Sequence, residues 1–587
     1  MNKPATPSGQ HASSAVLPER VMPAVHPCQL FPEAPASVSE AAPGLWLIDF
    51  GRVAFGNLEI TSPATGATGE IVVHFGEAFS GGRIERRPLG SVRYARVAVS
   101  LADDGKPVAV APPPDERNTN EIAVLLPPGW GVVLPFRLVE IEGWPVEAAP
   151  PVVRRRAAFA KTWDDHAAAF TCSDPLLDRI WELCRYTIKA TTFAGVYVDG
   201  DRERRPYEAD AWLNQLSHYT CDPDFSMARD TFRYLLRRPT RSTEWGLHMV
   251  FIAHADWLHT GDTSLVAAHY EALAGKLLLE RARPDGLLAG TPEQMKNDIV
   301  DWPPCERDNY VFMPVNTVVN AFHLRALALM AVLARALGRA ADADAFEARA
   351  RSVGAAFQRV LFDPARGLYR DGEGADHASL HANLFPLAFG LVPGEHRAGL
   401  VDFLVRRGMA CSVYAAQYLL EALFEYGADE AALGLVTADG DRSWKHMTES
   451  GATLTWEAWD QHYKPNQDWN HAWGAAPANL LPRYVAGVQV DAPGWKCLRI
   501  RPHPGPLASC TARVPTPPGP VGVDWRRDGD AFALAFSLPP GVTARLELPV
   551  VGAGRVRLDG QAVEAVRQGK RLLLSGKWGG CHRVVVQ

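Results

Sequence analysis

The chain has 587 residues, of which 47% are hydrophobic and 21% charged, and its formal net charge at pH 7 is -6. A chain of this length is divided among several domains with cores of their own, and this composition excludes an intrinsically disordered protein. The small negative charge, without long blocks of like charge, argues against nucleic acid and against an anionic membrane as partners.

The nine cysteines are scattered, with no Cys-x-x-Cys pair and no Cys/His spacing typical of a zinc site. We therefore expect free, mostly buried thiols. The first 31 residues contain no apolar run long enough for a signal peptide, and no stretch of eighteen apolar residues occurs in succession. This pattern predicts a soluble protein. It supports a cytoplasmic address only slightly, because an export signal that had been removed would leave no trace.

Strand patterns dominate the first part of the chain. Residues 1–43, which begin rich in Pro, Ser and Ala, are interpreted as an N-terminal extension. Between 44 and 165, short stretches such as "LWLIDFG", "GEIVVHFGEAF" and "RYARVAVSL" alternate apolar and polar residues, and Gly, Pro and Asp separate them. Short strands with turn signals at this spacing predict an antiparallel β-sandwich.

Helical patterns run from 166 to 485. In "TCSDPLLDRIWELCRYTIKATTF", Ser173 or Asp174 can cap a helix whose first turn contains Pro175, and apolar residues then recur at helical spacing. Further helices are expected over 316–338, 342–363 and 412–427. At ordinary helix and loop lengths the span holds roughly twelve helices, which can close into a double ring whose loops converge on one mouth.

Strand patterns return from 486 to 587, in stretches such as "AFALAFSLPPGVTARLELPV" and "HRVVVQ". They predict a second β-sandwich of about 100 residues. The expected architecture is therefore multidomain: a central all-α domain flanked by N-terminal and C-terminal antiparallel β-sandwich domains.

The segment "DGDRERRPYEAD", residues 199–210, concentrates carboxylates and arginines. Such a run is most often a solvated surface. Here it follows the apolar "TTFAGVYV" and leads into a helix with an apolar stripe that includes Trp212 and Leu216. Charges between two buried segments are expected to line a cavity, where arginines keep some carboxylates ionised and burial raises the pKa of another.

A second polar and aromatic segment covers residues 443–474 and holds five of the 17 tryptophans together with Glu457 and His471. Tryptophans three positions apart can equally form the core face of a helix. Glu457, however, lies between Trp456 and Trp459. A sugar suits such surroundings, because its C–H faces stack on aromatic rings while its hydroxyls form hydrogen bonds.

Two further segments are weaker candidates. "IVDWPP" offers Asp301 and Trp302 in a loop, and Glu244 begins an apolar helix, where most carboxylates act as caps. Two distant carboxylates in aromatic surroundings are what hydrolysis of a glycosidic bond requires: one protonates the departing oxygen, and the other activates water or attacks the anomeric carbon. No phosphate loop, dinucleotide fingerprint, Gly-x-Ser-x-Gly elbow or metal-ligand spacing competes with this chemistry.

These segments resemble signatures of the α-L-rhamnosidases of glycoside hydrolase family 78, over roughly residue 44 to the end. "DGDRERRPYEAD" is similar to the family's D-C-P-Q-R-[DE]-E-R-x-G-W-x-G-D, in which the Glu is the general acid. "TLTWEAWD" followed by "WNHAWG" is similar to its second signature, and "IVDWPP" and "EWGLHMVFIAHADWLHTGD" resemble a sugar-pocket loop and the helix after the acid. The chain departs from the family where Gly-Asp replaces Cys-Pro-Gln and where Pro206-Tyr207 replaces Gly-Trp.

The resemblance implies a six-hairpin helical toroid, (α/α)6, and an exo-acting, inverting hydrolase that removes a terminal α-L-rhamnosyl unit without a metal or another cofactor. Glu203 matches the general acid and Glu457 the general base. Inversion requires their carboxyl groups to lie roughly 6.5 to 9.5 Å apart. The candidate substrate-binding residues are Asp199, Arg202, Tyr207, Asp210, Glu244, Asp301, Trp302, Trp456, Trp459 and His471.

Two alternatives remain open. One is another toroidal carbohydrate enzyme, such as an unsaturated uronide hydrolase or a polysaccharide lyase, and a lyase would release a product that absorbs in the ultraviolet. The other is a non-catalytic carbohydrate-binding protein, whose binding would be unchanged in Glu203→Gln and Glu457→Gln. The aglycone, the linkage and the oligomeric state are not set by the sequence.

Overall fold

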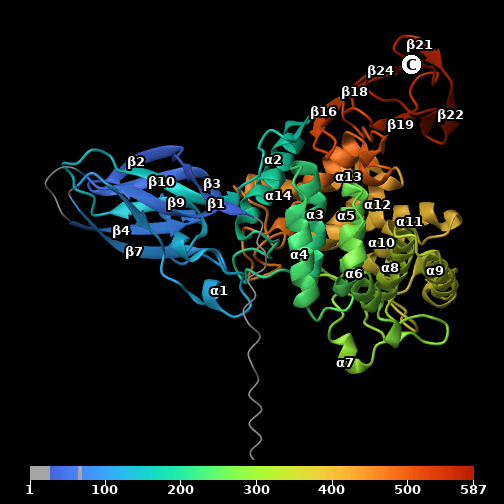
Figure 1. The fold of residues 1–587 in the computed structure, drawn as a ribbon, viewed down its shortest axis with the longest axis horizontal. Helices are drawn as coiled ribbons and strands as arrows, with labels where there is room; N and C mark the ends of the chain where they lie inside the picture. Colours follow the sequence, from blue (N-terminus) through green and yellow to red (C-terminus); the bar gives the residue numbers. More distant parts are fainter. Residues whose placement is uncertain (1–26, 64–68, 103) are drawn as a thin grey trace, which may run out of the picture.

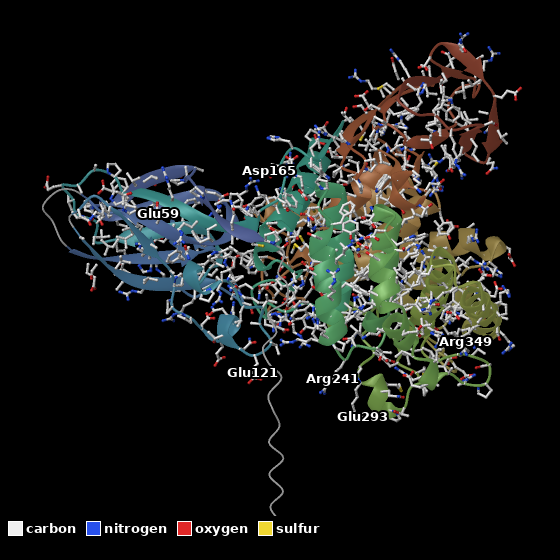
Figure 2. The ribbon with its side chains drawn as sticks, in the orientation of Figure 1. Glu59, Glu121, Asp165, Arg241, Glu293 and Arg349 are labelled. Carbon is white, nitrogen blue, oxygen red and sulfur yellow. The ribbon has the colours of Figure 1, made fainter. Side chains whose placement is uncertain are left out.

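The computed structural model describes residues 27–63, 69–102 and 104–587. Along the chain, a β-sheet domain is followed by a helical domain and then by a second region of β-sheet (Figure 1). Charged side chains such as Arg241, Glu293 and Arg349 extend outward from the helical domain into solvent (Figure 2). A helical domain with flanking β-sheet domains is thus the observed architecture, as the sequence predicts.

The N-terminal domain is built on an eight-stranded antiparallel sheet in which β3 pairs with four other strands. The first half of β3 lies between β2 and β9, and its second half lies between β10 and β8. Side chains such as Ile48, Val73 and Phe136 fill a core separate from that of the rest of the chain. The strands are β1 (Cys28–Glu33), β2 (Ser37–Ala42), β3 (Leu45–Thr61), β4 (Gly69–Gly76), β7 (Tyr94–Leu101), β8 (Pro107–Val110), β9 (Leu134–Glu142) and β10 (Val152–Ala160).

This domain begins earlier than the predicted boundary at residue 44. β1 pairs with β10 and β2 pairs with β3, so residues from Cys28 onward belong to the sheet and not to an extension. The sequence hid both strands because β1 contains Pro32 and every residue of β2 is exposed, so neither alternates clearly. The rest of the expected extension, residues 1–26, lies outside the described residues, as does most of the stretch searched for a signal peptide.

The first helix of the helical domain begins where the sequence predicts. Asp174 caps α2 (Pro175–Ala190) by accepting a hydrogen bond from the Leu176 N–H, and the apolar stripe of this helix is buried. The expected helix over 316–338 is α8 (Thr317–Ala336), which Asn316 caps, and the one over 412–427 is α12 (Val413–Glu425), which Ser412 caps. The others of eight residues or more are α3 (Glu208–Cys221), α4 (Ser226–Arg237), α5 (His248–Thr260), α6 (Ser264–Ala274), α9 (Ala340–Leu361), α10 (Leu380–Ala388), α11 (Arg397–Arg407) and α13 (Asp429–Val436).

These helices differ in burial. α3, α5, α8, α10 and α12 are buried along most of their length and contact one another in succession, α3 with α5, α5 with α8, α8 with α10 and α10 with α12. α4, α9 and α11 pack outside them and keep an exposed face. In the described chain, α8 is the one helix long and apolar enough to cross a membrane, and 83% of its most apolar window is buried within the protein.

The C-terminal region has a seven-stranded and a five-stranded sheet. Its core is continuous with that of the helical domain, and the Trp525 indole N–H donates to the Val485 carbonyl at 2.9 Å. Strand β11 (Ala169–Cys172) precedes α2 in the chain but pairs with β16 (Ser509–Val514), so this part of the predicted helical domain belongs to a C-terminal sheet. None of the nine cysteines, all of which lie in the described residues, forms a disulfide bond, and of these nine only Cys305 and Cys581 are exposed.

Candidate active site

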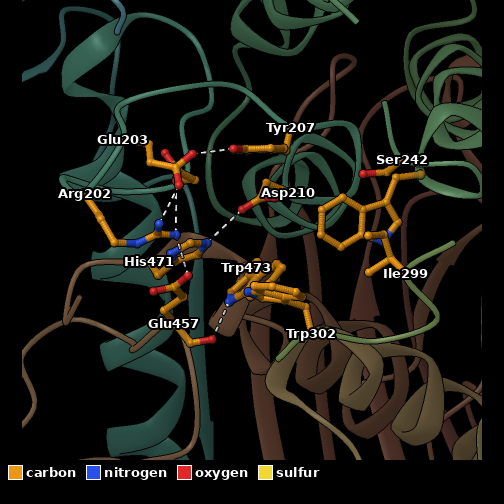
Figure 3. Close-up of a pocket in the computed structure, with 12 residues that line it drawn as sticks. Arg202, Glu203, Tyr207, Asp210, Ser242, Ile299, Trp302, Glu457, His471 and Trp473 are labelled. Atoms are coloured by element: carbon orange, nitrogen blue, oxygen red, sulfur yellow. Dashed lines mark hydrogen bonds and ion pairs between the residues drawn. The ribbon is translucent and has the colours of Figure 1, made fainter. Parts of the chain in front are cut away.

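A cavity of about 200 Å³ opens at the loop ends of the helical domain (Figure 3). Pockets for drug-sized ligands measure about 300–1,000 Å³, so this one suits a ligand near the size of a single sugar ring. Its walls combine carboxylates and cations with tryptophan, the surface that a sugar prefers. The lining residues are Asp199, Arg202, Glu203, Tyr207, Asp210, Ser242, Trp245, Ile299, Trp302, Glu457, His471 and Trp473.

The loop that carries Glu203, which we call the acid loop (residues 199–207), joins α2 and its following turn to α3. It turns sharply at Gly200, whose φ is +103°. A Cβ there would meet Asp468 Oδ2 at 2.6 Å, so only glycine permits this approach. The close contact brings the acid loop against the segment that carries Glu457, which we call the base loop (residues 455–471).

Glu203 and Glu457 face the cavity from these two loops and share one arginine. Arg202 donates from Nη1 to Glu203 and from Nη2 to Glu457 Oε1 at 2.8 Å (Figure 3). The Glu203 side chain is 28% exposed, whereas that of Glu457 is 2% exposed. The more accessible carboxyl group can reach a departing group that leaves toward solvent, and the buried one can act on a water held inside the cavity.

The surroundings of Glu457 raise the pKa of its carboxyl group. Burial raises the pKa of this carboxyl group and the nearby Asp468 raises it further, while His471, Arg202 and Lys464 lower it. Its Oε2 has no hydrogen-bond partner among the described residues. A buried, unpaired oxygen of a carboxylate needs a donor, and a water or a sugar hydroxyl would supply one.

Asp199 offers a second carboxylate oxygen that accepts no hydrogen bond from the part of the chain that the structure describes, although Arg202 Nη2 lies 3.8 Å from it. Its Oδ1 accepts from the Arg205 N–H at 3.0 Å, but its Oδ2 has no hydrogen-bond partner among the described residues. Burial raises the pKa of Asp199 well above its ordinary value, and the charge of Glu203 adds to this. Asp199 can therefore donate a hydrogen bond to a bound hydroxyl as well as accept one from it.

His471 forms a charged floor to the cavity. Its Nε2 lies 2.8 Å from Asp210 Oδ1, and its Nδ1 lies 3.4 Å from Asp468 Oδ1. Burial alone would lower the pKa of the imidazole, but the hydrogen bonds to Asp210 and Asp468 raise it to about 10. The ring is therefore an imidazolium at neutral pH, with each N–H directed at a carboxylate.

Tyr207, which stands where the resembling signature has a tryptophan, lies beside Glu203. Its hydroxyl donates to Glu203 Oε2, and its ring packs edge-on against Trp245. Trp302 lines the cavity beside Lys464, whose ammonium lies 5.8 Å from the ring centre. The apolar wall thus consists of rings from separate loops, available to stack on a sugar.

Four predicted substrate-binding residues do not line the cavity. Asp301 is fully buried and accepts hydrogen bonds from the Ser412 N–H at 2.9 Å and from His381 at 2.7 Å, so it holds the loop that carries Trp302. Glu244, whose pKa burial raises to about 7, accepts from the Ile299 N–H at 2.9 Å and supports the same loop. Asp301 and Glu244 were predicted from their neighbours in sequence. The groups that donate hydrogen bonds to them lie far along the chain.

Trp456 and Trp459 belong to the core. Trp456 stacks on Trp469 and is 6% exposed. Trp459 is fully buried and donates to the Cys411 carbonyl at 2.7 Å. Both are therefore core residues, although they lie in a loop and not on the face of a helix.

The cavity also contains residues that the sequence analysis did not single out: Ser242, Trp245, Ile299 and Trp473. Trp245 directly follows Glu244, and Trp473 lies inside the "WNHAWG" segment, so both stood within segments already of interest. Nothing in the local sequence distinguishes Ser242 or Ile299.

The side chains of Glu457, Asp468 and His471 could be considered for a metal ion, because one ligand atom of each lies within 4.8 Å of the others. The cluster is already neutralised, however. His471, whose pKa is raised to about 10, pairs with Asp468, and Arg202 and Lys464 pair with Glu457 at 2.8 and 3.4 Å. A divalent cation would have to displace these positive charges, so the cluster fits a sugar hydroxyl better than a metal.

Paired carboxylates in a small aromatic cavity at the loop ends of a helical domain define a carbohydrate-active type of site. The model of the bacterial alpha-L-rhamnosidase six-hairpin glycosidase domain matches residues 165–485, and that of the bacterial alpha-L-rhamnosidase C-terminal domain matches residues 487–562. The chain belongs to the bacterial alpha-L-rhamnosidase family, the one that the two motifs resemble.

Relatives and solved structures agree with this assignment. The chain is 25% identical over 352 residues to an alpha-L-rhamnosidase of Formosa agariphila, covering 57% of this chain and 36% of the relative. An alpha-L-rhamnosidase of Alteromonas sp. is 24% identical over 457 residues, with 70% and 48% covered. The chain thus spans less than half the length of these curated relatives.

The fold matches solved structures over nearly the whole chain. The alpha-L-rhamnosidase from Dictyoglumus thermophilum has a TM-score of 0.78 at 19% identity, covering 95% of this chain and 63% of that one. The Streptomyces avermitilis alpha-L-rhamnosidase complexed with L-rhamnose has a TM-score of 0.77 at 19% identity, with 96% and 54% covered.

Proposed function

We propose that the protein is an exo-acting, inverting glycoside hydrolase that releases terminal α-L-rhamnose from oligosaccharides or glycosides. The observation that carries the proposal is the placement of Glu203 and Glu457, from two distant loops, on one sugar-sized cavity with Arg202 between them. Membership of the family indicates rhamnose as the sugar. The cavity volume of about 200 Å³ favours a terminal sugar unit over an internal stretch of a sugar chain.

In the proposed reaction Glu203 is the general acid and Glu457 the general base. The bond between the anomeric carbon and the glycosidic oxygen breaks, and the proton of Glu203 passes to the departing oxygen. A water molecule bonds to the anomeric carbon from the opposite face, and Glu457 takes its proton. Exchange with solvent then returns both carboxyl groups to their starting states, and no metal or other cofactor enters a step.

The other polar residues would hold the sugar. Asp199 Oδ2, which has no hydrogen-bond partner among the described residues, would bind a sugar hydroxyl, and Asp210 and His471 form the charged floor. Trp302, Trp245 and Trp473 would provide the stacking surface. The oligomeric state and the aglycone are not assigned.

We also propose that the helices form an (α/α)6 toroid and that the flanking sheets are β-sandwiches. The successive contacts of α3, α5, α8, α10 and α12, with α4, α9 and α11 outside them, support an inner and an outer ring. The pairing of the two halves of β3 with different strands, and the two C-terminal sheets, support two-layered domains.

The test is hydrolysis of p-nitrophenyl α-L-rhamnopyranoside beside the p-nitrophenyl glycosides of other sugars. We expect release from the rhamnoside alone, with the β-anomer appearing first in the NMR spectrum of the product. Glu457→Gln should keep the fold and lose turnover, and Glu203→Gln should keep the fold with a smaller loss on this substrate, because p-nitrophenolate departs without a proton. Release of the α-anomer first would reject inversion, and an ultraviolet-absorbing product from an acidic polysaccharide would indicate a lyase.

A further inference from the structure

Asp201 is a buried carboxylate of the acid loop that the proposed mechanism does not use. It is fully buried and contacts three arginines: Arg204 of its own loop, and Arg93 and Arg117 of the N-terminal sheet domain. Burial alone would raise the pKa of Asp201, but these arginines lower it to about 2. It is therefore ionised at every working pH, and it lies two residues before Glu203.

The N-terminal domain also contacts the base loop. The Ser91 N–H donates to the Gln467 carbonyl at 2.9 Å, and Asn470 Nδ2 lies 3.4 Å from both carboxylate oxygens of Glu77. A Cβ on Gly90 would meet the Gln467 carbonyl at 2.8 Å, so the two backbones touch there.

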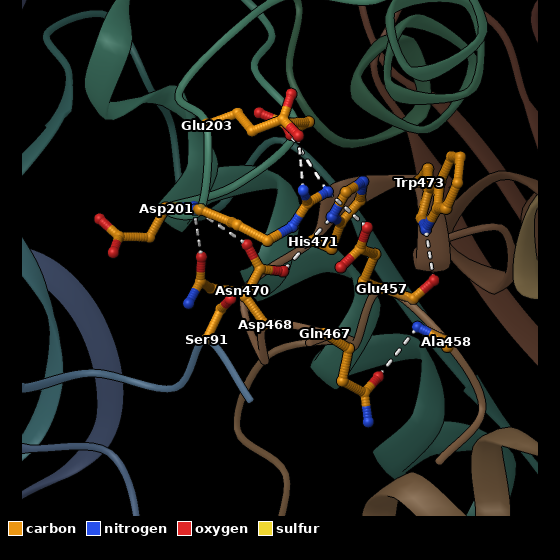
Figure 4. A network of polar contacts seen from close by, with 12 residues as sticks. Ser91, Asp201, Glu203, Glu457, Ala458, Gln467, Asp468, Asn470, His471 and Trp473 are labelled. Atoms are coloured by element: carbon orange, nitrogen blue, oxygen red, sulfur yellow. Dashed lines mark hydrogen bonds and ion pairs between the residues drawn. The ribbon is translucent and has the colours of Figure 1, made fainter. Parts of the chain in front are cut away.

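The two loops are also joined to each other beneath this contact (Figure 4). Asn470 Oδ1 of the base loop accepts from the Asp201 N–H of the acid loop at 2.8 Å. Within the base loop, the side chain of Gln467 accepts at 3.0 Å from the N–H of Ala458, which directly follows Glu457. Residues 77–93 of the N-terminal domain thus bond to the acid loop two residues from the acid, and to the base loop through residues that themselves hold the base.

We propose that Arg93 is a positioning residue for the general acid, and that it makes the N-terminal sheet domain part of the active site. Arg93 fixes Asp201, and Asp201 fixes the backbone from which Glu203 extends. This inference rests on the proposed function, since it assigns Arg93 a role in the same reaction.

The geometry distinguishes this role from an ordinary domain contact. Arg93 bonds to Asp201 through Nε and to Asp115 through its terminal nitrogens, so its fork is held on two sides. Lysine has a single nitrogen and cannot reproduce this arrangement of separate donors. Arg137 forms a matched pair with Asp49, at 2.8 and 2.7 Å, within the same sheet and without contact to either catalytic loop.

The experiment compares Arg93→Ala, Arg93→Lys and the control Arg137→Ala by kcat and KM on p-nitrophenyl α-L-rhamnopyranoside. For Arg93→Ala we expect kcat to fall about 10- to 100-fold, because small displacements of a catalytic group have effects of this size, with KM within about twofold. Arg93→Lys should recover part of kcat, and Arg137→Ala should match the unmodified enzyme. In Asp201→Asn combined with Arg93→Ala, the loss should not exceed the larger single loss, since the two act as one unit.

Hydrogen exchange of the full chain tests the same inference without turnover. Peptides covering 199–205 and 461–470 should exchange faster in Arg93→Ala and unchanged in Arg137→Ala. If the unmodified enzyme hydrolyses no rhamnoside, the proposed function fails, and the exchange result still decides whether Arg93 holds the loops. Unmodified kcat in Arg93→Ala, or losses equal to those of Arg137→Ala, would overturn the proposal. If Arg93→Ala does not fold, Arg93→Lys and Asp201→Asn carry the comparison.

Discussion

His471 Nε2 and Asp210 Oδ1 lie 2.8 Å apart although 261 positions separate the two residues. Asp210 is in the first turn of α3, directly after the acid loop, and His471 ends the base loop. The bond therefore joins the two segments that carry the proposed acid and base, and it places a positive charge on the cavity floor. This charge lowers the pKa of the neighbouring Glu457 against the effect of burial.

Asp210→Asn tests this pair, because it replaces the carboxylate with an amide of similar size. We expect the pKa of His471 to fall from about 10 toward its ordinary value, as measured by NMR titration of the ring. When folding raises the pKa of a histidine, the resulting stabilisation of the folded state is complete below about pH 6.5. This stabilisation is lost as the pH rises through about 10. The unmodified protein should therefore lose thermal stability between these pH values, and Asp210→Asn should lose less.

The matched control is Asp429→Asn, because Asp429 pairs with His503 at 2.8 Å away from the cavity. It should leave the titration of His471 unchanged. An unaltered His471 titration in Asp210→Asn would show that Asp210 does not hold the charge.

The two carboxylates should respond differently to the leaving group. p-Nitrophenolate departs without a proton, whereas an alkyl alcohol needs one, so the general acid matters more for the alkyl glycoside. We expect Glu203→Gln to lower kcat/KM on an alkyl α-L-rhamnoside about 100- to 10,000-fold, and on the p-nitrophenyl substrate by a clearly smaller factor. Glu457→Gln should reduce both by similar factors, since the attacking water is the same. Equal losses in Glu203→Gln on both substrates would remove Glu203 from the acid role.

Tyr207→Phe removes the hydroxyl that donates to Glu203 while keeping the ring against Trp245. Glu203 then keeps Arg202 as its partner and can rotate more freely. We expect kcat to fall about tenfold with little change in KM, since the stacking surface remains. Tyr207→Trp restores the residue of the family signature and a larger stacking surface, so it should lower KM without restoring the hydroxyl. If Tyr207→Phe changes KM and leaves kcat unaltered, the hydroxyl binds substrate and does not position the acid.

The sequence predicts the elements of this fold better than the contacts between them. Periodicity and capping residues were sufficient for α2, α8 and α12, because each has an apolar stripe and a polar cap. The exposed strand β2 and the proline-containing β1 carried no such pattern, and β11 joined a sheet whose other strands lie more than 300 residues later.

The same division holds for the site. Glu203, Glu457 and His471 stand in segments whose composition is unusual, and the structure brings them to one cavity. Asp301 and Glu244 looked equivalent in sequence, yet they accept hydrogen bonds from Ser412 and Ile299, which no local pattern could indicate. The sequence did not indicate a role for Arg93 for the same reason, because its partner Asp201 belongs to another domain.

Glu77 gives a prediction about the pH dependence of stability at the contact between the domains. Burial raises its pKa from 4.5 to about 8, and the nearby charges of Asp201 and Asp468 add to this. The unfolded chain releases this proton above about 4.5, whereas the folded protein keeps it until about pH 8. The stabilisation is therefore complete below 4.5, declines between these pH values and is lost above 8.

Glu77→Gln should remove this dependence, because the amide stays neutral and its oxygen can still accept from the Arg93 N–H, which lies 3.2 Å from the carboxylate. We expect the thermal midpoint of Glu77→Gln to fall less than that of the unmodified protein between pH 5 and pH 9, with the curves diverging as the pH rises. Glu59→Gln, on the same sheet and outside this contact, should follow the unmodified protein. Parallel curves for Glu77→Gln and the unmodified protein would mean that Glu77 titrates normally, and that the contact between the N-terminal domain and the base loop tolerates its charge.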